Sequence, residues 1–205
     1  MPIAWWGLVG LFAAALINRA ADCWFSPARL ACGLTRHPAR QAAVWAGVPV
    51  LFALLAGREM AQAQVATACL FAAILVLLAV IDLEQRRLPD VIVLPALALA
   101  LVVRPGGDLG ATVAGAVAAG ALFLLLYAVG RRLYGPGALG MGDVKLAALI
   151  GAVVGLERLA LALPLGIFLA GAAALVLLLS GRATRGDSLP YGHFMALAAV
   201  VVMVV

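Results

Sequence analysis

The chain has 205 residues, of which 66% are hydrophobic and 11% charged, and its formal net charge is +5 at pH 7. A soluble domain carries about 25% charged residues, so this composition excludes an ordinary soluble enzyme and leaves no room for a separate soluble domain. Apolar runs of about twenty residues recur with short polar breaks, which is the pattern of transmembrane helices. The sequence therefore predicts an all-α fold, a polytopic integral membrane helical bundle.

The apolar runs predict about eight membrane spans. They cover residues 3–18, 41–57, 63–81, 89–103, 110–130, 144–156, 159–180 and 189–205. No basic residue precedes the first run, so we expect a retained span there and not a cleaved signal peptide. Spans of this number and length make the lipid bilayer the main surroundings of the protein.

Basic residues are distributed unevenly among the connections between these spans. The odd-numbered connections carry 11 basic residues and the even-numbered ones 3, which together make all 14 Lys and Arg residues. The positive-inside rule then places the odd-numbered connections in the cytoplasm and both termini outside. Because cytoplasmic loops account for the positive charge, no nucleic-acid partner is expected.

The chain contains Cys23, Cys32 and Cys69, an odd number with no CxxC pair. Such a set indicates neither a disulfide framework nor a structural zinc site. We therefore expect no metal and no cofactor.

Asp82 ends an apolar run directly, with no polar lead-in, in the stretch FAAILVLLAVIDLEQ. An ionisable side chain at that depth is costly, which makes it a functional candidate. Taken alone, Asp82 is better explained as a carboxylate in the headgroup region beside Arg86 and Arg87.

Asp143 follows the glycines of GALGMGD and opens the apolar stretch VKLAALIGA. Alone, it is a good helix N-cap, whose carboxylate would accept from amides of the first turn. In that case Gly140 and Gly142 merely make the turn. Alternatively, these two glycines bind substrate by letting an extended backbone approach closely.

Asp82 and Asp143 are separated by one predicted span outward and one back, so both return to the cytoplasmic face at similar depth. Two carboxylates that meet at the edge of low-dielectric lipid do not easily both ionise, so they would share a proton at neutral pH. Aspartic proteases use this arrangement. One carboxylate takes a proton from the attacking water, and the other polarises the peptide carbonyl.

Two other classes of function stay open at this point. A small polytopic transporter or a proton-coupled channel would also use Asp82 and Asp143, although both lie at one membrane face and not at midplane. A structural or assembly protein without chemistry would need Asp82 only at the interface and Asp143 only as a cap.

The stretches IDLEQRRLPD, residues 81–90, and GMGDVKL, residues 140–146, resemble the two catalytic motifs of type IV prepilin peptidases. These are membrane aspartyl proteases of the GxGD class. The resemblance covers residues 63–205 as a six-helix peptidase core. It leaves residues 1–62 as two N-terminal spans joined by a short basic cytoplasmic loop, and it implies that Asp82 and Asp143 are the catalytic pair.

The resemblance also implies a substrate, namely the precursor of a type IV pilin, an Flp-type pilin or a type II secretion pseudopilin. Its short basic leader would be removed at the cytoplasmic face of the bacterial inner membrane, just before the apolar N-terminal helix. Asp90 or Glu84 would bind substrate by attracting that leader. Pro89 and Asp90 also fit an ordinary helix start.

The sequence departs from the family in two places. Long members carry a cytoplasmic insert with two zinc-binding CxxC pairs, and they N-methylate the new N-terminus. The corresponding loop here, RAADCWFSPARLACGLTRHPAR, has neither pair, so the chain resembles a short form in which methyltransferase activity is not expected. A PFGP-like stretch before the last span reads LPYGHFMAL, where His193 is interpreted as a helix-start residue and not a catalytic one.

Overall fold

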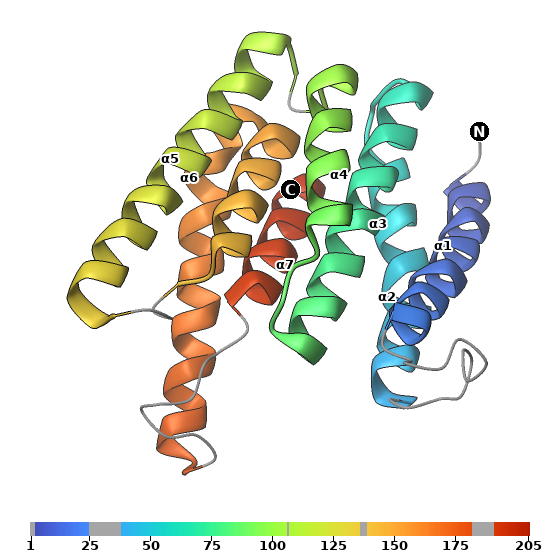
Figure 1. Cartoon of the computed structure of the whole chain (residues 1–205). Coiled ribbons are helices and arrows are strands. Elements are labelled where there is room, and N and C mark those ends of the chain that lie inside the picture. Colours follow the sequence, from blue (N-terminus) through green and yellow to red (C-terminus); the bar gives the residue numbers. More distant parts are fainter. Residues whose placement is uncertain (1–2, 25–37, 106, 136–138, 182–190) are drawn as a thin grey trace.

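The computed structural model describes residues 3–24, 38–105, 107–135, 139–181 and 191–205 (Figure 1). In these parts of the chain it consists of helices and contains no strand. The helices are α1 (Ile3–Trp24), α2 (Pro38–Ala56), α3 (Gln62–Gln85), α4 (Asp90–Val103), α5 (Leu109–Tyr134), α6 (Met141–Leu179) and α7 (Tyr191–Val204).

The predicted fold class, an all-α membrane bundle, is confirmed. Helices α1, α2, α3, α5 and α6 are each long and apolar enough to cross a membrane. Helices α4 and α7 have 14 residues each, fewer than the roughly 20 that span the hydrocarbon core. The described chain thus forms seven helices, and the expected number of eight spans is not confirmed.

The difference in number arises in α6, which contains both predicted spans 144–156 and 159–180. At Gly155 its backbone has φ 76° and ψ 169°, values that no helix adopts. Glycine takes such a conformation without the steric cost that a Cβ atom would add. Figure 1 shows the consequence, since the second arm of α6 runs back alongside the first and extends beyond it.

Glycines allow the helices of this part of the bundle to touch. A Cβ atom added to Gly115 in α5 would lie 2.2 Å from the carbonyl oxygen of Gly151 in α6. In the second arm of α6, a Cβ atom on Gly166 would lie 3.0 Å from the Cα atom of Met195 in α7. Backbones that approach this closely are typical of helix packing in lipid, where small residues form the contact.

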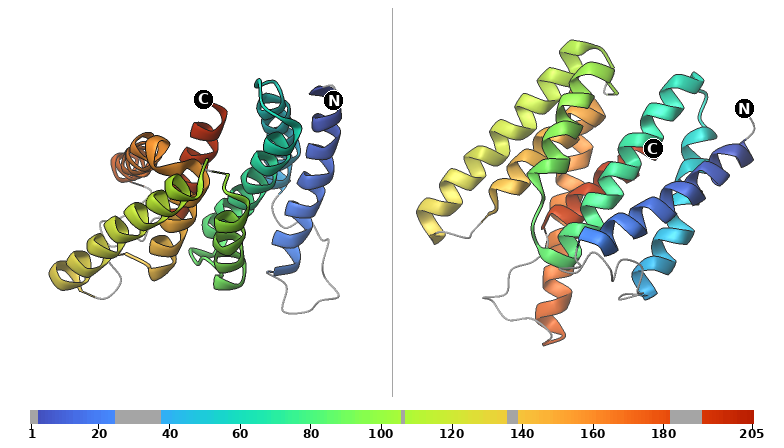
Figure 2. Two further views of the ribbon diagram at one scale, coloured as in Figure 1. Left: turned by 90° about the horizontal axis from the view of Figure 1, so that it is seen from above. Right: turned by 45° about the vertical axis from the view of Figure 1, so that its right-hand side comes forward.

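Helix α7 lies in the middle of the molecule and packs between α3 and α6 (Figures 1 and 2). Its buried residues include Met195, Ala199 and Met203. At one end of the bundle, the side chain of Arg58 donates to the carbonyl oxygens of Met203 and Val205, at 2.8 and 3.1 Å, and so satisfies acceptors at the end of α7. The first turn of α7 therefore lies at the opposite end.

Helices α1 and α2 pack on each other and are joined to α3 by buried ion pairs. Helix α1 continues beyond the predicted end at residue 18, which places Asp22 in a helix, where its carboxylate pairs with Arg40 of α2. The Nη1 atom of Arg40 also lies 3.4 Å from the Oε1 atom of Glu84 in α3. The three side chains are 9%, 7% and 14% exposed, so charges of both signs are buried together.

The cysteines differ from expectation in one respect. Cys69 is a free, buried thiol in α3. Cys23 is disulfide-bonded, whereas the sequence indicated no disulfide framework. Most of the predicted basic loop after the first span, from residue 25 to 37, also lies outside them.

Candidate active site

Asp82 lies on the last turn of α3 and is 4% exposed. Its Oδ2 atom accepts a hydrogen bond from the main-chain N–H of His193 in α7, at 2.7 Å. Helix α3 ends soon afterwards because Arg86 takes a left-handed conformation with φ 54°, and Pro89 can offer no amide to continue the helix. Asp82 is thus a buried carboxylate held at the end of its helix.

Asp143 lies in the first turn of α6 and is half-buried. It is not the N-cap, because Gly140 occupies that position. Instead Oδ2 of Asp143 turns back and accepts from the Gly140 N–H at 3.2 Å. This satisfies one of the amides that a helix start leaves without a partner. The alternative interpretation of Asp143 as the N-cap residue is therefore wrong, because Asp143 lies three residues after the N-cap.

The structure brings both aspartates against one residue, Gly192 of α7. A Cβ atom added to Gly192 would lie 3.0 Å from Oδ2 of Asp82 and 3.2 Å from Oδ1 of Asp143. The two carboxylate oxygens are consequently no further apart than the sum of these distances. Asp82 and Asp143 thus face each other across the bare backbone of Gly192.

Gly140 and Gly142, which were predicted to bind substrate, have neighbours inside the protein. A Cβ atom on Gly142 would lie 3.1 Å from Cβ of Leu88, and one on Gly140 would lie 3.2 Å from Oδ2 of Asp143. The same Leu88 side chain lies 3.1 Å from the Cβ position of Gly192. Both glycines therefore allow close internal packing, and a contact with substrate stays a prediction.

Glu84 and Asp90, the other predicted substrate-binding residues, each have a cationic partner. Asp90 begins α4, and its Oδ2 atom accepts from Nζ of Lys145 at 2.6 Å, which ties the start of α4 to the start of α6. Glu84 lies two residues after Asp82, about 200° around the helix, and faces Arg40. The structure therefore does not bring Glu84 to the aspartate pair.

Sequence reasoning did not select Leu88 and Gly192 as site residues. Leu88 directly precedes Pro89, which was interpreted as part of a helix start. Gly192 directly precedes His193, which was interpreted in the same way. His193 contributes its main-chain amide to Asp82, and its ring atom Nδ1 lies 3.0 Å from the carbonyl oxygen of Ala79. Its interpretation as a residue of the helix start agrees with this geometry.

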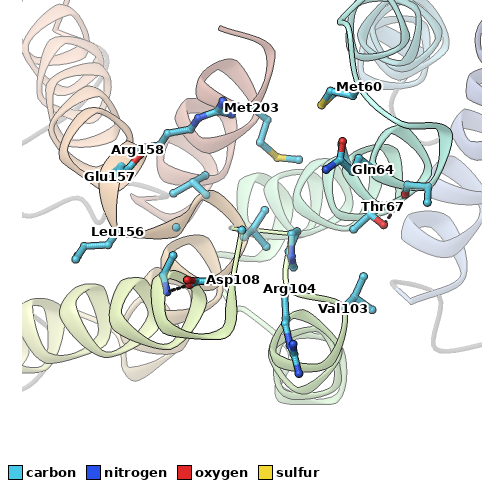
Figure 3. Close-up of a pocket in the computed structure, with 18 residues that line it drawn as sticks. Met60, Gln64, Thr67, Val103, Arg104, Asp108, Leu156, Glu157, Arg158 and Met203 are labelled. Atoms are coloured by element: carbon cyan, nitrogen blue, oxygen red, sulfur yellow. Dashed lines mark hydrogen bonds between the residues drawn. The ribbon is translucent and has the colours of Figure 1, made fainter.

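A cleft of about 930 Å³ lies at the other end of the bundle (Figure 3). Its lining includes Gln64, which precedes Asp82 by 18 residues of continuous helix and therefore lies about 27 Å away along α3. Asp108, on the same cleft, accepts from the Ala111 N–H at 2.6 Å and caps α5. No residue predicted for catalysis or substrate binding lines this cleft, so size alone does not identify the site.

Paired carboxylates can hold and activate a water molecule without any further group. Within the described parts of the chain, no group of three or more His, Cys, Asp or Glu side chains is placed to hold a metal ion. Fold and site together define a polytopic membrane protein with two facing aspartates at one end of its helical bundle.

Comparison with known sequences then identifies the family. The chain belongs to the type IV leader peptidase family, whose sequence model matches residues 69–179. This segment contains both aspartates but ends before Gly192. No solved structure matches the chain significantly.

Curated relatives carry the name prepilin leader peptidase/N-methyltransferase. The protein of Pseudomonas putida is 36% identical over 127 residues, which cover 60% of this chain and 44% of the relative. The protein of Bacillus subtilis is 30% identical over 154 residues, which cover 74% of this chain and 60% of the relative. The protein of Aeromonas salmonicida is 31% identical over 173 residues, which cover 80% of this chain and 60% of the relative. The chain thus spans about half the length of the relatives that it matches.

Proposed function

We propose that this protein is a membrane aspartyl endopeptidase that removes the basic leader from precursors of type IV pilins, Flp-type pilins or type II secretion pseudopilins. The proposal is carried by the position of Asp82 and Asp143, whose carboxylate oxygens both contact the space beside Gly192. Membership of the leader peptidase family supports a peptide substrate, and the names of the relatives support a prepilin. Residues 63–205 form the proposed peptidase core.

In the proposed mechanism, the two aspartates share one proton and hold a water molecule between them. The ionised carboxylate takes a proton from this water as its oxygen attacks the carbonyl carbon of the scissile bond. The protonated carboxylate donates to the carbonyl oxygen, which develops negative charge. When the tetrahedral intermediate collapses, the carboxylate that took a proton from water gives it to the leaving nitrogen, and the C–N bond breaks. The hydroxyl of water stays on the leader, and the mature subunit gains a free amine.

The proposed location is the bacterial cytoplasmic membrane, with both termini outside and the aspartates at the cytoplasmic face. The distribution of 11 basic residues in odd-numbered connections against 3 in even-numbered ones supports this orientation. Arg86, Arg87 and Lys145 all lie close in sequence to the aspartates. A basic leader, the lipid headgroups and the active site would then share one interface.

Two other activities have less support. The relatives named above combine a peptidase with an N-methyltransferase, but the loop after the first span contains no CxxC pair. We therefore propose peptidase activity alone. The transporter or channel alternative finds no support among the relatives, which carry the name of a peptidase.

The test is a processing assay with purified protein in lipid and a synthetic prepilin that has a basic leader, a glycine and an apolar helix. Wild type should shorten the precursor, and mass spectrometry should find a new, unmethylated N-terminus. Asp82→Asn and Asp143→Asn should each leave the precursor intact. Cleavage by the double Asn variant, or none by folded wild type on several prepilins, would refute the proposal.

A further inference from the structure

We propose that the first turn of α7 forms the third side of the active site, with Gly192 keeping the space between the carboxylates open and the His193 amide holding Asp82. This inference rests on the proposed function, because it assumes that Asp82 and Asp143 perform the chemistry. It assigns a role to a segment outside the part of the chain that the family model matches, residues 69–179.

A side chain at Gly192 would be crowded from three sides. A methyl group there would lie 3.0 Å from one carboxylate oxygen, 3.2 Å from the other and 3.1 Å from Cδ1 of Leu88. These three contacts come from the end of α3, the start of α6 and the connection before α4. Since all three are tighter than ordinary contacts, a methyl group would displace at least one carboxylate by a few tenths of an ångström.

That displacement matters because catalysis depends on geometry. A water molecule shared by two carboxylates must lie within about 2.6–3.2 Å of an oxygen on each. Misplacing a reacting group by a fraction of an ångström to 1 Å costs up to about a hundredfold in rate. The absence of a side chain at Gly192 is therefore a requirement of the reaction and not only of packing.

His193 acts on Asp82 through its main chain. Its N–H belongs to the first turn of α7, where amides have no partner inside the helix, and it donates to Oδ2 of Asp82 at 2.7 Å. A hydrogen bond to a carboxylate favours the ionised form. The ring contributes separately, since Nδ1 lies 3.0 Å from the carbonyl oxygen of Ala79, on the same helix as Asp82. His193 is thus a positioning residue that attaches α7 to α3.

The role of Gly192 is tested by Gly192→Ala in the full chain, with Gly171→Ala as matched control. Gly171 lies in α6, and a Cβ atom there would meet nothing within 4 Å. We expect Gly192→Ala to lower kcat by about tenfold to a hundredfold with little change in KM, while Gly171→Ala cleaves like wild type. Both variants should unfold at similar temperatures in the same detergent, and Gly192→Val should be inactive.

The amide of His193 is tested by comparing His193→Ala with His193→Pro. Alanine removes only the ring, whereas proline also removes the N–H, and proline is tolerated in the first turn of a helix. We expect both variants to cleave at neutral pH. In the proline variant alone, the acid limb of the pH–rate profile should move toward neutral, because the ionised aspartate pair has lost a hydrogen-bond donor.

The outcomes separate this inference from the proposed function. If wild type cleaves and Gly192→Ala has the kcat of Gly171→Ala, or if the two His193 variants have the same pH profile, the role of the α7 turn is refuted while the peptidase stands. If folded wild type cleaves no prepilin, the proposed function fails and this inference fails with it.

Discussion

The main-chain amide of His193 donates to the carboxylate of Asp82 at 2.7 Å, although 111 residues separate the two in the chain. The contact joins the last described helix to the end of α3 and defines one side of the aspartate pair. It also shows why a chain of this kind needs its C-terminal helix close to the site. Removing that helix would leave a buried carboxylate without a donor, which is costly.

Both aspartates are expected to act as one unit. Asp82→Asn and Asp143→Asn should each reduce kcat by more than about a thousandfold, since a shared proton requires both carboxylates. The double variant should be no worse than either single one, because residues that act together have non-additive effects. Single-turnover cleavage of a prepilin measures all three variants. Losses that multiply in the double variant would contradict a shared mechanism.

Cleavage is expected to depend on pH as a bell-shaped curve. The pair needs one proton, so kcat should fall at alkaline pH as both carboxylates ionise, and at acid pH as both become protonated. The two limbs belong to the pair and not to either residue. The measurement is kcat across the pH range, with the unfolding temperature recorded at each pH as control. A rate that keeps rising at alkaline pH would exclude the shared proton.

Chelating agents are expected to leave cleavage unchanged. Two carboxylates activate water by proton transfer alone, so the mechanism requires no metal ion. The check is to assay the purified protein after extensive treatment with a strong chelator, and to compare it with untreated protein. Loss of activity that added metal restores would indicate a different chemistry.

Arg40 is expected to contribute more to stability than Lys145, although each forms an ion pair. Arg40→Ala would leave Glu84 without its cationic partner and Asp22 with only the Gln41 amide, and breaking a buried pair lowers the free energy of unfolding by about 3–5 kcal/mol. Lys145 and Asp90 are 31% and 53% exposed, so Lys145→Ala should cost at most about 1 kcal/mol. Unfolding in mixed detergent micelles compares the two variants. An equal loss in the free energy of unfolding for both variants would contradict the burial of the ion pairs that Arg40 forms with Asp22 and Glu84.

Much of the fold could be predicted because hydropathy marks each apolar helix. The prediction was less accurate where charge interrupts the pattern. Asp22 lies beyond an apolar run and therefore resembles a loop residue, but its ion pair with Arg40 allows α1 to continue past it. Two separate spans were predicted on either side of residue 157, and the chain does reverse close to that residue, at Gly155. A local pattern does not reveal which glycine will adopt a positive φ.

The candidate site was predictable in part for a related reason. Asp82 and Asp143 attract attention because carboxylates are rare beside apolar runs. Gly192 could not be predicted as a site residue, because glycine is common in membrane helices. Its role depends on contacts with Asp82 and Asp143, which are distant in sequence. Glu84 was predicted to bind substrate by attracting the basic leader. Two residues along a helix turn a side chain to the opposite face, and there Glu84 meets Arg40.

The buried network of Asp22, Arg40 and Glu84 also bears on how the chain enters the membrane during synthesis. Asp22 and Arg40 emerge from the ribosome well before Glu84, and they pair within the first two helices. An isolated charge inside the bilayer is costly, whereas an ion pair is far less so. The first two helices can therefore insert together with this ion pair already formed, and α3 completes the network only when it arrives. The order of residues along the chain is thus also an order of assembly, in which the helix that carries Asp82 is added to a partner already in place.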